Sequence, residues 1–167
     1  MLRLAGIVRE SITDGPGIRF TIFCQGCPHS CKGCHNMQTW DFNGGKNVSE
    51  EKILAAIDEN PIIKGVTFSG GEPFCQAESF LKLAEEIKAR NLDIVIYTGY
   101  QFEELLNSED DNIRNLIGKA DLIVDGPFIE EKKDLSLKFR GSSNQRIIDG
   151  KRSLNSGKII LANEYMV

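Results

Sequence analysis

Three cysteines stand close together near the start of the chain, and cysteine thiolates are ligands for soft metals. Cys27, Cys31 and Cys34 form a C-x3-C-x2-C array directly after a strand-like run, Arg19 to Cys24. Four-iron clusters normally take four cysteine thiolates. Three thiolates would leave the fourth iron open, and an open metal position is where catalytic chemistry takes place, as at catalytic zinc. The spacing therefore favours a catalytic [4Fe–4S] cluster.

Two other interpretations of the cysteines stay open on spacing alone. Cys24 lies three residues before Cys27, so the run also reads as four ligands of one zinc ion. Zinc ribbons usually separate their cysteine pairs by about 15–20 residues, far more than here. Redox-active or incidental thiols are the second alternative. A disulfide framework is disfavoured, because five cysteines are an odd number and no apolar secretion segment is visible. Cys24 and Cys75 are expected to be ordinary structural thiols.

Length and composition describe an ordinary globular protein. The 167 residues suggest a single domain over 1–167, and 41% hydrophobic with 26% charged residues is typical of one. The net charge is −4 and no basic block is present, so no nucleic-acid partner is expected. No apolar run approaches the roughly 18 residues of a membrane helix, so we expect no membrane partner and a cytoplasmic location.

Strands and helices alternate along the chain and must position the cysteines. The patterns predict strands at 18–24, 65–69, 92–98, 121–125 and 157–162, and helices at 50–59, 77–90, 101–107 and 111–118. Ser49 is expected to cap the first helix. This alternation implies right-handed crossovers and a mostly parallel sheet. A complete eight-fold barrel typically needs about 250 residues, so we expect an α/β fold with an open or partial (β/α) barrel.

Several motifs directly follow the predicted strands. Active sites in such folds gather at the carboxyl ends of the strands, where the cysteine array, Ser69 to Glu72, Thr98 and Asp125 all fall. Gly70 and Gly71 would let a ligand approach the backbone closely, and Glu72 offers an acceptor suited to a ligand ammonium group. The segment Arg140 to Arg146 is either a solvated polar loop or a polar docking contact for a partner.

Taken together, the motifs resemble a known family. Cys27-x3-Cys31-x2-Cys34 with Ser69-Gly-Gly-Glu-Pro resembles the radical S-adenosylmethionine (SAM) enzymes. Asp14-Gly-Pro-Gly-Ile-Arg-Phe, Cys34-His-Asn and Thr39-Trp-Asp-Phe look like its glycyl-radical-activating branch. Asp125-Gly-Pro-Phe and Arg140-Gly-Ser-Ser-Asn-Gln-Arg-Ile are similar to the activases of anaerobic ribonucleoside-triphosphate reductases. The resemblance spans nearly the whole chain.

The resemblance implies a radical SAM domain with two cofactors. Cys27, Cys31 and Cys34 would hold a [4Fe–4S] cluster, and SAM would chelate its open iron through amino and carboxylate groups. Ser69, Gly70, Gly71 and Glu72 would steady the amino end of SAM, while Thr98 and Asp125 would contact SAM or a nearby cation. Backbone groups at Gly33, Cys34 and His35 would serve the adenine. No catalytic side chain is implied beyond the cluster and SAM.

Gly33 is a departure from the broad family pattern, which places an aromatic residue just before the third cysteine. In having glycine at this position the chain resembles the reductase activases, whereas pyruvate formate-lyase activases carry an aromatic residue. The substitution removes a stacking face for adenine, so backbone contacts would have to replace it. The shorter chain also favours the reductase activases.

The implied activity is that of an oxidoreductase that generates a glycyl radical. Reductive cleavage of SAM would give methionine and a 5′-deoxyadenosyl radical, which takes a hydrogen from a backbone glycine of the large reductase subunit. A low-potential electron donor such as flavodoxin is implied, and a homodimer is one assembly that the resemblance allows. The alternatives are an activase of another glycyl-radical enzyme such as pyruvate formate-lyase, or a non-catalytic zinc- or iron-binding regulatory module.

Overall fold

A single seven-stranded sheet forms the centre of the molecule, with the strand order β3-β1-β2-β4-β5-β6-β7. The computed structural model describes residues 1–166. Its strands are β1 (Leu2–Ser11), β2 (Arg19–Cys24), β3 (Lys46–Val48), β4 (Gly65–Gly70), β5 (Asp93–Tyr97), β6 (Leu122–Asp125) and β7 (Arg146–Asp149). Its α-helices are α1 (Glu50–Asp58), α2 (Ala77–Ala89), α3 (Phe102–Leu106), α4 (Asp111–Lys119) and α5 (Gly150–Ser156).

The sheet is mixed, with a parallel centre and antiparallel edges. β2, β4, β5 and β6 pair in parallel. β1 is antiparallel to both β2 and β3, and β7 is antiparallel to β6. β3 consequently runs in the same direction as the four central strands, and only β1 and β7 are reversed, so the prediction of a mostly parallel sheet is confirmed. β3 and β7 are the edges of an open sheet, which does not close into a barrel.

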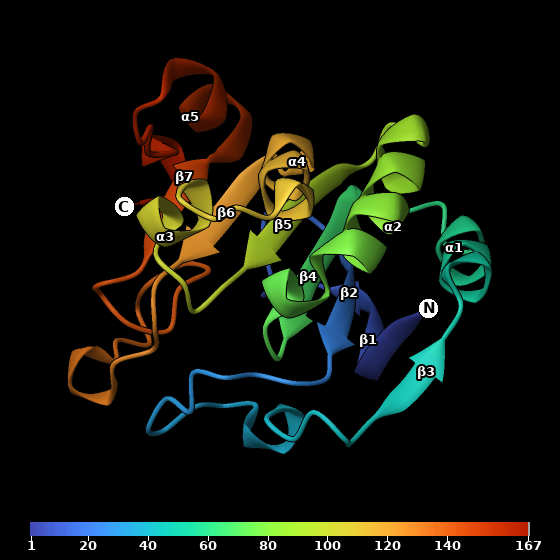
Figure 1. Ribbon diagram of the computed structural model, residues 1–167, viewed down its shortest axis with the longest axis horizontal. Coiled ribbons are helices and arrows are strands. Elements are labelled where there is room, and N and C mark those ends of the chain that lie inside the picture. The colour runs from blue at the N-terminus through green and yellow to red at the C-terminus, as the bar shows by residue number, and fades with distance from the viewer. Residues whose placement is uncertain (167) are drawn as a thin grey trace.

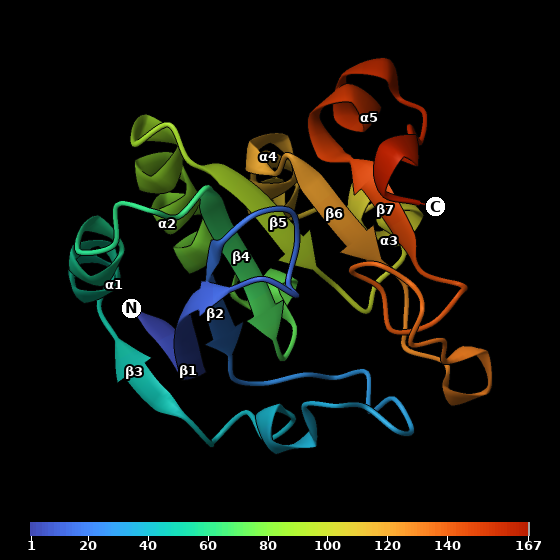
Figure 2. The same cartoon turned by 180° about the vertical axis from the view of Figure 1, so that it is seen from behind.

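Helices cover one face of this sheet, as Figures 1 and 2 show for α1, α2 and α4. Because side chains alternate along a strand, neighbouring residues enter different clusters. Ile94 and Ile96 of β5 face the helices and join the main core, which includes Phe80 of α2. Val95 and Tyr97 face the other way and pack in a smaller cluster with residues of the C-terminal part of the chain. Within residues 1–166, the helices are too short or too polar to cross a membrane.

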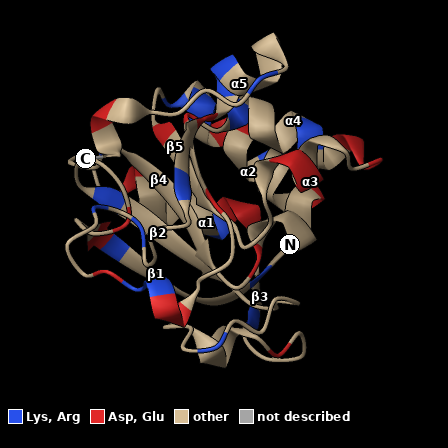
Figure 3. Ribbon diagram, turned by 90° about the vertical axis from the view of Figure 1, so that its left-hand side faces the viewer, with Lys and Arg blue, Asp and Glu red and all other residues tan. Residues whose placement is uncertain are grey.

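Most of the predicted elements are present with shifted ends. Ser49 caps α1 as expected, since its hydroxyl accepts a hydrogen bond from the Lys52 amide at 3.3 Å. Basic and acidic residues are interspersed over the helices and loops (Figure 3). Some of them form surface ion pairs, such as that of Arg90 with Asp58.

The prediction of a last strand at 157–162 was wrong. Gly157 ends α5 in a left-handed conformation, with φ +71°, which is the common glycine stop signal of a helix. After it, only Leu161 forms an isolated bridge, to Ile148. The edge strand is instead β7, immediately before α5. Strand β1, at the opposite side of the sheet, was not predicted either.

The carboxyl ends of the central strands point to one edge of the sheet. In both views the arrowheads of β2, β4, β5 and β6 point that way (Figures 1 and 2). Two long connections run along this edge: residues 25–45, called the cysteine loop below, and residues 126–145, called the 126–145 segment. The fold thereby brings the predicted motifs to one place, as the parallel order of strands requires.

Candidate functional site

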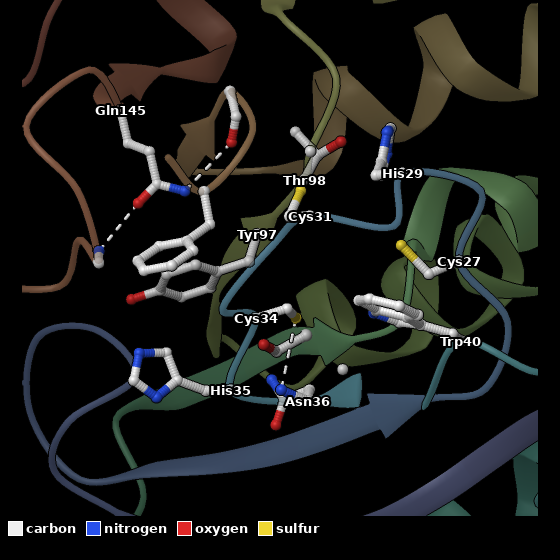
Figure 4. A pocket seen from close by; sticks show the side chains of 17 residues that line it. Cys27, His29, Cys31, Cys34, His35, Asn36, Trp40, Tyr97, Thr98 and Gln145 are labelled. Atoms are coloured by element: carbon white, nitrogen blue, oxygen red, sulfur yellow. Dashed lines mark hydrogen bonds between the residues drawn. The ribbon is translucent and has the colours of Figure 1, made fainter. Parts of the chain in front are cut away.

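A pocket opens at this edge, between the cysteine loop and the 126–145 segment (Figure 4). Most of the site residues predicted from the sequence line it, namely Cys27, Cys31, Cys34, His35, Ser69, Gly70, Gly71 and Thr98. Three others, Gly33, Glu72 and Asp125, are not among the lining residues. Predicted residues from three separate stretches of sequence therefore do meet, and the three exceptions have other partners.

The cysteine loop folds back on itself without regular structure around the three thiols. The amide of Gly26 donates to the carbonyl of Thr39 at 2.7 Å, and that of Cys27 donates to the carbonyl of Trp40 at 3.2 Å. Gly26 has φ +103°, and a side chain there would collide with the ring of Phe42. These contacts close the loop at its base, so that the three half-buried thiols face the same space.

Cys24 and the three pocket thiols lie in different surroundings. Within residues 1–166, no three His, Cys, Asp or Glu side chains are placed to hold a single metal ion. A four-iron cluster makes a different demand, because each cysteine binds its own iron and the sulfur atoms need not converge on one point. Cys24, the fourth ligand in the zinc interpretation, is fully buried in the hydrophobic core and is not part of the pocket lining.

Cys27 is held as a neutral thiol in the free protein. Burial raises its pKa to about 11, because a thiolate is poorly solvated there. Metal ligation requires the thiolate, so a bound cluster would displace this proton and compensate the charge. Binding of such a group is therefore coupled to deprotonation of Cys27.

Trp40 supplies an independent sign that the pocket accommodates a bound group. Its indole Nε1 is buried and has no hydrogen-bond partner, although the side chain lines the pocket beside the three cysteines (Figure 4). Buried donors are nearly always paired, and an unpaired one costs free energy. A sulfur-rich cluster would bring acceptors into this space, so the residues present fit the group that the cysteine spacing indicates.

The Gly-Gly-Glu turn packs directly against the base of the cysteine loop. Gly70 has φ +90°, which favours glycine. The amide of Gly71 donates to the carbonyl of Cys24, and the amide of Glu72 donates to that of Gly26, both at 2.8 Å. A Cβ on Gly71 would lie 2.3 Å from the Gly26 oxygen. Glycine is needed here for contact with the protein's own backbone, whatever ligand also approaches.

Glu72 has a different environment from the ligand-facing one that the sequence suggested. Its side chain is fully buried and accepts four hydrogen bonds from the protein. Oε1 accepts from the Thr98 hydroxyl at 2.7 Å and the Phe74 amide at 3.2 Å, while Oε2 accepts from His29 Nε2 at 2.7 Å and the Gly99 amide at 2.9 Å. A carboxylate has about four acceptor positions, so protein donors occupy its capacity.

Asp125 and Gly33 also lie outside the pocket lining. Asp125 is 1% exposed and bonds to the guanidinium of Arg146 and to the amide of Phe102. Gly33 has φ +77°, and a side chain there would meet Glu130 of the 126–145 segment. Direct contact of the Asp125 side chain with a ligand in the pocket is therefore not what the structure favours.

The 126–145 segment closes the far side of the pocket and was not predicted to do so. The ring of Phe128 packs edge to face with His35, with 5.5 Å between the ring centres. Gln145 ties the segment together, because its amide nitrogen donates to the Gly126 carbonyl at 3.1 Å and its oxygen accepts from the Gly141 amide at 2.8 Å (Figure 4). Tyr97, on β5, lines the pocket beneath it. Phe128 and Gln145 belong to the Asp125-Gly-Pro-Phe and Arg140-Gly-Ser-Ser-Asn-Gln-Arg-Ile motifs, but nothing in those motifs predicted that the two side chains line the pocket.

Comparisons with known proteins agree with this geometry. A family of 4Fe-4S single cluster domains matches residues 13–148. The anaerobic ribonucleoside-triphosphate reductase-activating protein of Vibrio cholerae is 39% identical over 144 residues, which cover 81% of this chain and 90% of that protein. The proteins of the same name from Escherichia coli K12 and Enterobacteria phage T4 are 39% and 35% identical over 142 residues, 80% of this chain and 90% and 85% of those proteins.

A solved structure, QueE from Escherichia coli, is similar only at a distance. The identity is 20% and the TM-score 0.45, over 59% of this chain and 52% of QueE. The family match and the relatives, in contrast, cover most of the chain at substantial identity. The chain therefore belongs to the family of anaerobic ribonucleoside-triphosphate reductase-activating proteins.

Proposed function

We propose that the protein is an enzyme that activates an anaerobic ribonucleoside-triphosphate reductase by generating a glycyl radical on it. One observation carries the proposal: Cys27, Cys31 and Cys34 line the same pocket as the Ser69–Gly71 turn at the carboxyl edge of a parallel sheet. Family membership supports the same activity. The proposal treats residues 1–167 as a single radical SAM domain.

The protein's own residues bind, position and shield the reacting groups. Cys27, Cys31 and Cys34 would hold a [4Fe–4S] cluster and leave one iron for SAM. When bound and reduced by the electron donor, such a cluster would supply the single electron needed for reductive cleavage of SAM, and with it the radical chemistry that acts on the partner's glycine. Ser69 and the two glycines would receive the amino end of SAM. The cofactor supplies the difficult chemistry, and the protein supplies position and exclusion of water.

Aromatic side chains would provide that exclusion. Trp40, Tyr97 and Phe128 line the pocket from three different elements, the cysteine loop, β5 and the 126–145 segment. A radical formed in such a lining meets few water molecules. The large glycyl-radical subunit must then present its glycine at the pocket mouth.

The proposed partners follow from this chemistry. They are the large reductase subunit and a low-potential electron donor such as flavodoxin, in the cytoplasm. A homodimer belongs to the same proposal and is tested by sedimentation of the cluster-loaded protein.

Anaerobic reconstitution tests the function. We expect about four irons and four sulfides per chain, a paramagnetic signal on reduction that changes when SAM is added, and release of methionine and 5′-deoxyadenosine. Mixing with the reductase subunit should produce a glycyl radical there. A radical that forms only on pyruvate formate-lyase would point to the other activase class. A protein that binds zinc or iron without cleaving SAM would be a regulatory module, and the proposal would be wrong.

A further inference from the structure

His29 connects the cysteine loop to the Gly-Gly-Glu turn. It lies between Cys27 and Cys31, and its Nε2 is 2.7 Å from Oε2 of Glu72. Glu72 is fully buried and His29 is 15% exposed, so the contact is largely shielded from solvent.

The other three donors to Glu72 have a different origin. Thr98 and Gly99 follow β5, and Phe74 follows the turn itself, so they fix the carboxylate to the sheet edge. The Thr98 hydroxyl is also fixed, because it accepts from the Tyr100 amide at 3.1 Å. His29 is thus the donor that relates the carboxylate to the cluster-binding loop.

The imidazole ring is held in a specific place by its surroundings. It packs edge to face against Tyr100, with 4.5 Å between ring centres. Gly99 leaves the necessary room, since a Cβ there would be 2.4 Å from the imidazole Cδ2. Ser30, the next residue, has φ +51°, an unusual conformation for a residue other than glycine. Such a pre-organised contact is what a positioning residue needs.

We propose that His29 is a positioning residue that sets the distance between the SAM-binding turn and the cluster. Backbone hydrogen bonds already join Gly71 and Glu72 to the base of the cysteine loop, and His29 adds a contact from the stretch between Cys27 and Cys31 to the Glu72 side chain. The inference rests on the proposed function, because it assumes that a cluster and SAM occupy the pocket. Residues that orient the groups around a metal site affect affinity strongly without touching the ligand, and small displacements at a reacting centre reduce rates severely.

Two substitutions separate the hydrogen bond from the packing. His29→Gln retains an N–H donor that can reach Glu72, whereas His29→Phe retains a ring against Tyr100 but cannot donate. At equal iron and sulfide content, we expect His29→Phe to bind SAM about 10-fold more weakly, which is about 1.4 kcal/mol. His29→Gln should recover most of the affinity. Lys32→Gln, an exposed position in the same loop, is the matched control and should bind as the wild type does.

The outcomes against the proposal are specific. Wild-type affinity in His29→Phe would show that the contact positions nothing. Equal weakening in both His29 variants would show that ring packing matters and the hydrogen bond does not. Loss of the cluster in His29→Phe, with normal SAM affinity in the remaining loaded fraction, would make His29 a residue of the cysteine loop alone.

A measurement on the free protein keeps this inference separate from the proposed function. The chain has two histidines, His29 and His35, so ring-labelled histidine gives two spin systems, and His35→Gln assigns them. We expect the Nε2 proton of His29 to be shifted downfield and protected from exchange with water. A rapidly exchanging proton would overturn the geometry. If the wild type shows the protected proton but never binds SAM, the proposed function fails while the His29–Glu72 contact stands.

Discussion

Asp125 and Arg146 form an ion pair that joins the end of β6 to the beginning of β7. Arg146 Nε donates to Asp125 Oδ1 at 3.0 Å, and the same guanidinium makes bonds of 3.0 and 2.9 Å to the carboxylate of Glu103. Asp125 also accepts from the Phe102 amide at 2.8 Å, at the start of α3. The pair therefore fixes the strand ends that carry the 126–145 segment, and Arg146 is engaged in structure rather than available for docking a partner.

Asp125→Asn should destabilise the protein and leave SAM affinity nearly unchanged. We expect a loss of about 2 kcal/mol in the free energy of unfolding, within the range for hydrogen bonds to charged groups. Chemical denaturation of the free protein under reducing conditions measures it. Asp58→Asn, which removes an exposed pair with Arg90, is the control and should have little effect. Unchanged stability with loss of SAM binding would instead make Asp125 a cofactor contact, as the sequence had suggested.

Glu103 should make the stability of the free protein sensitive to acid. The hydrogen bond from Arg146 lowers the pKa of Glu103 below its ordinary value of 4.5. A carboxyl whose pKa is lower in the folded state contributes its full stability above the unfolded value, and this is lost as the pH falls through the folded value. Stability should therefore decrease below pH 4.5, and less steeply in Glu103→Gln. Glu109→Gln, at an exposed position on the next loop, is the control and should keep the wild-type dependence of stability on pH. If Glu103→Gln also keeps the wild-type dependence, Glu103 is not the source of the acid sensitivity.

The five cysteines should divide into two groups. Cys27→Ala, Cys31→Ala and Cys34→Ala are each expected to abolish the intact cluster and SAM cleavage. Cys24→Ala should retain both, because its side chain lies in the hydrophobic core and its loss leaves only a small cavity. Cys75→Ala should also retain both. Iron and sulfide analysis decides the matter, and a Cys24 variant that cannot hold four irons would refute the three-ligand assignment.

Gly71→Ala should impair the cluster as well as SAM binding. The sequence alone suggested that a side chain here would obstruct only a ligand, but the added Cβ would lie 2.3 Å from the carbonyl oxygen of Gly26. The base of the cysteine loop would have to move, so we expect reduced iron content in the purified protein. Gly6→Ala is a suitable control, because nothing lies within 4 Å of a Cβ at that position. Normal iron content in Gly71→Ala would show that the loop base yields without consequence.

Local patterns were enough to predict the cysteine loop and the strand ends. The spacing of the three cysteines lies within eight residues, and the alternation of strand and helix patterns indicates a parallel sheet whose strand ends share one edge. The partners of individual side chains were not predictable in this way. Whether Glu72 faces a ligand or turns back to His29 and Thr98 depends on two loops far apart in sequence. Phe128 and Gln145 reach the pocket only through the tertiary path of their segment.

The edge strand shows the same limit of local patterns. The sequence pattern predicted the last strand at 157–162, which is richer in apolar residues than 146–149. The run at 146–149 pairs with β6 over four residues. The run at 157–162 follows the stop at Gly157 and makes one bridge. Pairing in the sheet decided between them, and periodicity could not.

Trp40→Phe should affect the cluster-loaded protein more than the free one. In the free protein the indole N–H has no partner, so its removal costs no hydrogen bond and the ring still packs. We therefore expect the free energy of unfolding to change by less than about 1 kcal/mol. If the cluster provides the missing acceptor, the loaded variant loses a hydrogen bond that the loaded wild type has, and it should release iron to a chelator faster.

Because Trp40 is the only tryptophan, its fluorescence reports on the same site. Emission of the wild type should fall as the cluster is assembled and return when iron is removed, since the indole lines the pocket with all three cysteines. His35→Gln, which keeps the tryptophan and alters another lining side chain, is the control for quenching. If Trp40→Phe and the wild type release iron at equal rates, the bound group does not accept a hydrogen bond from the indole N–H. Trp40 would then have no part in holding the cluster.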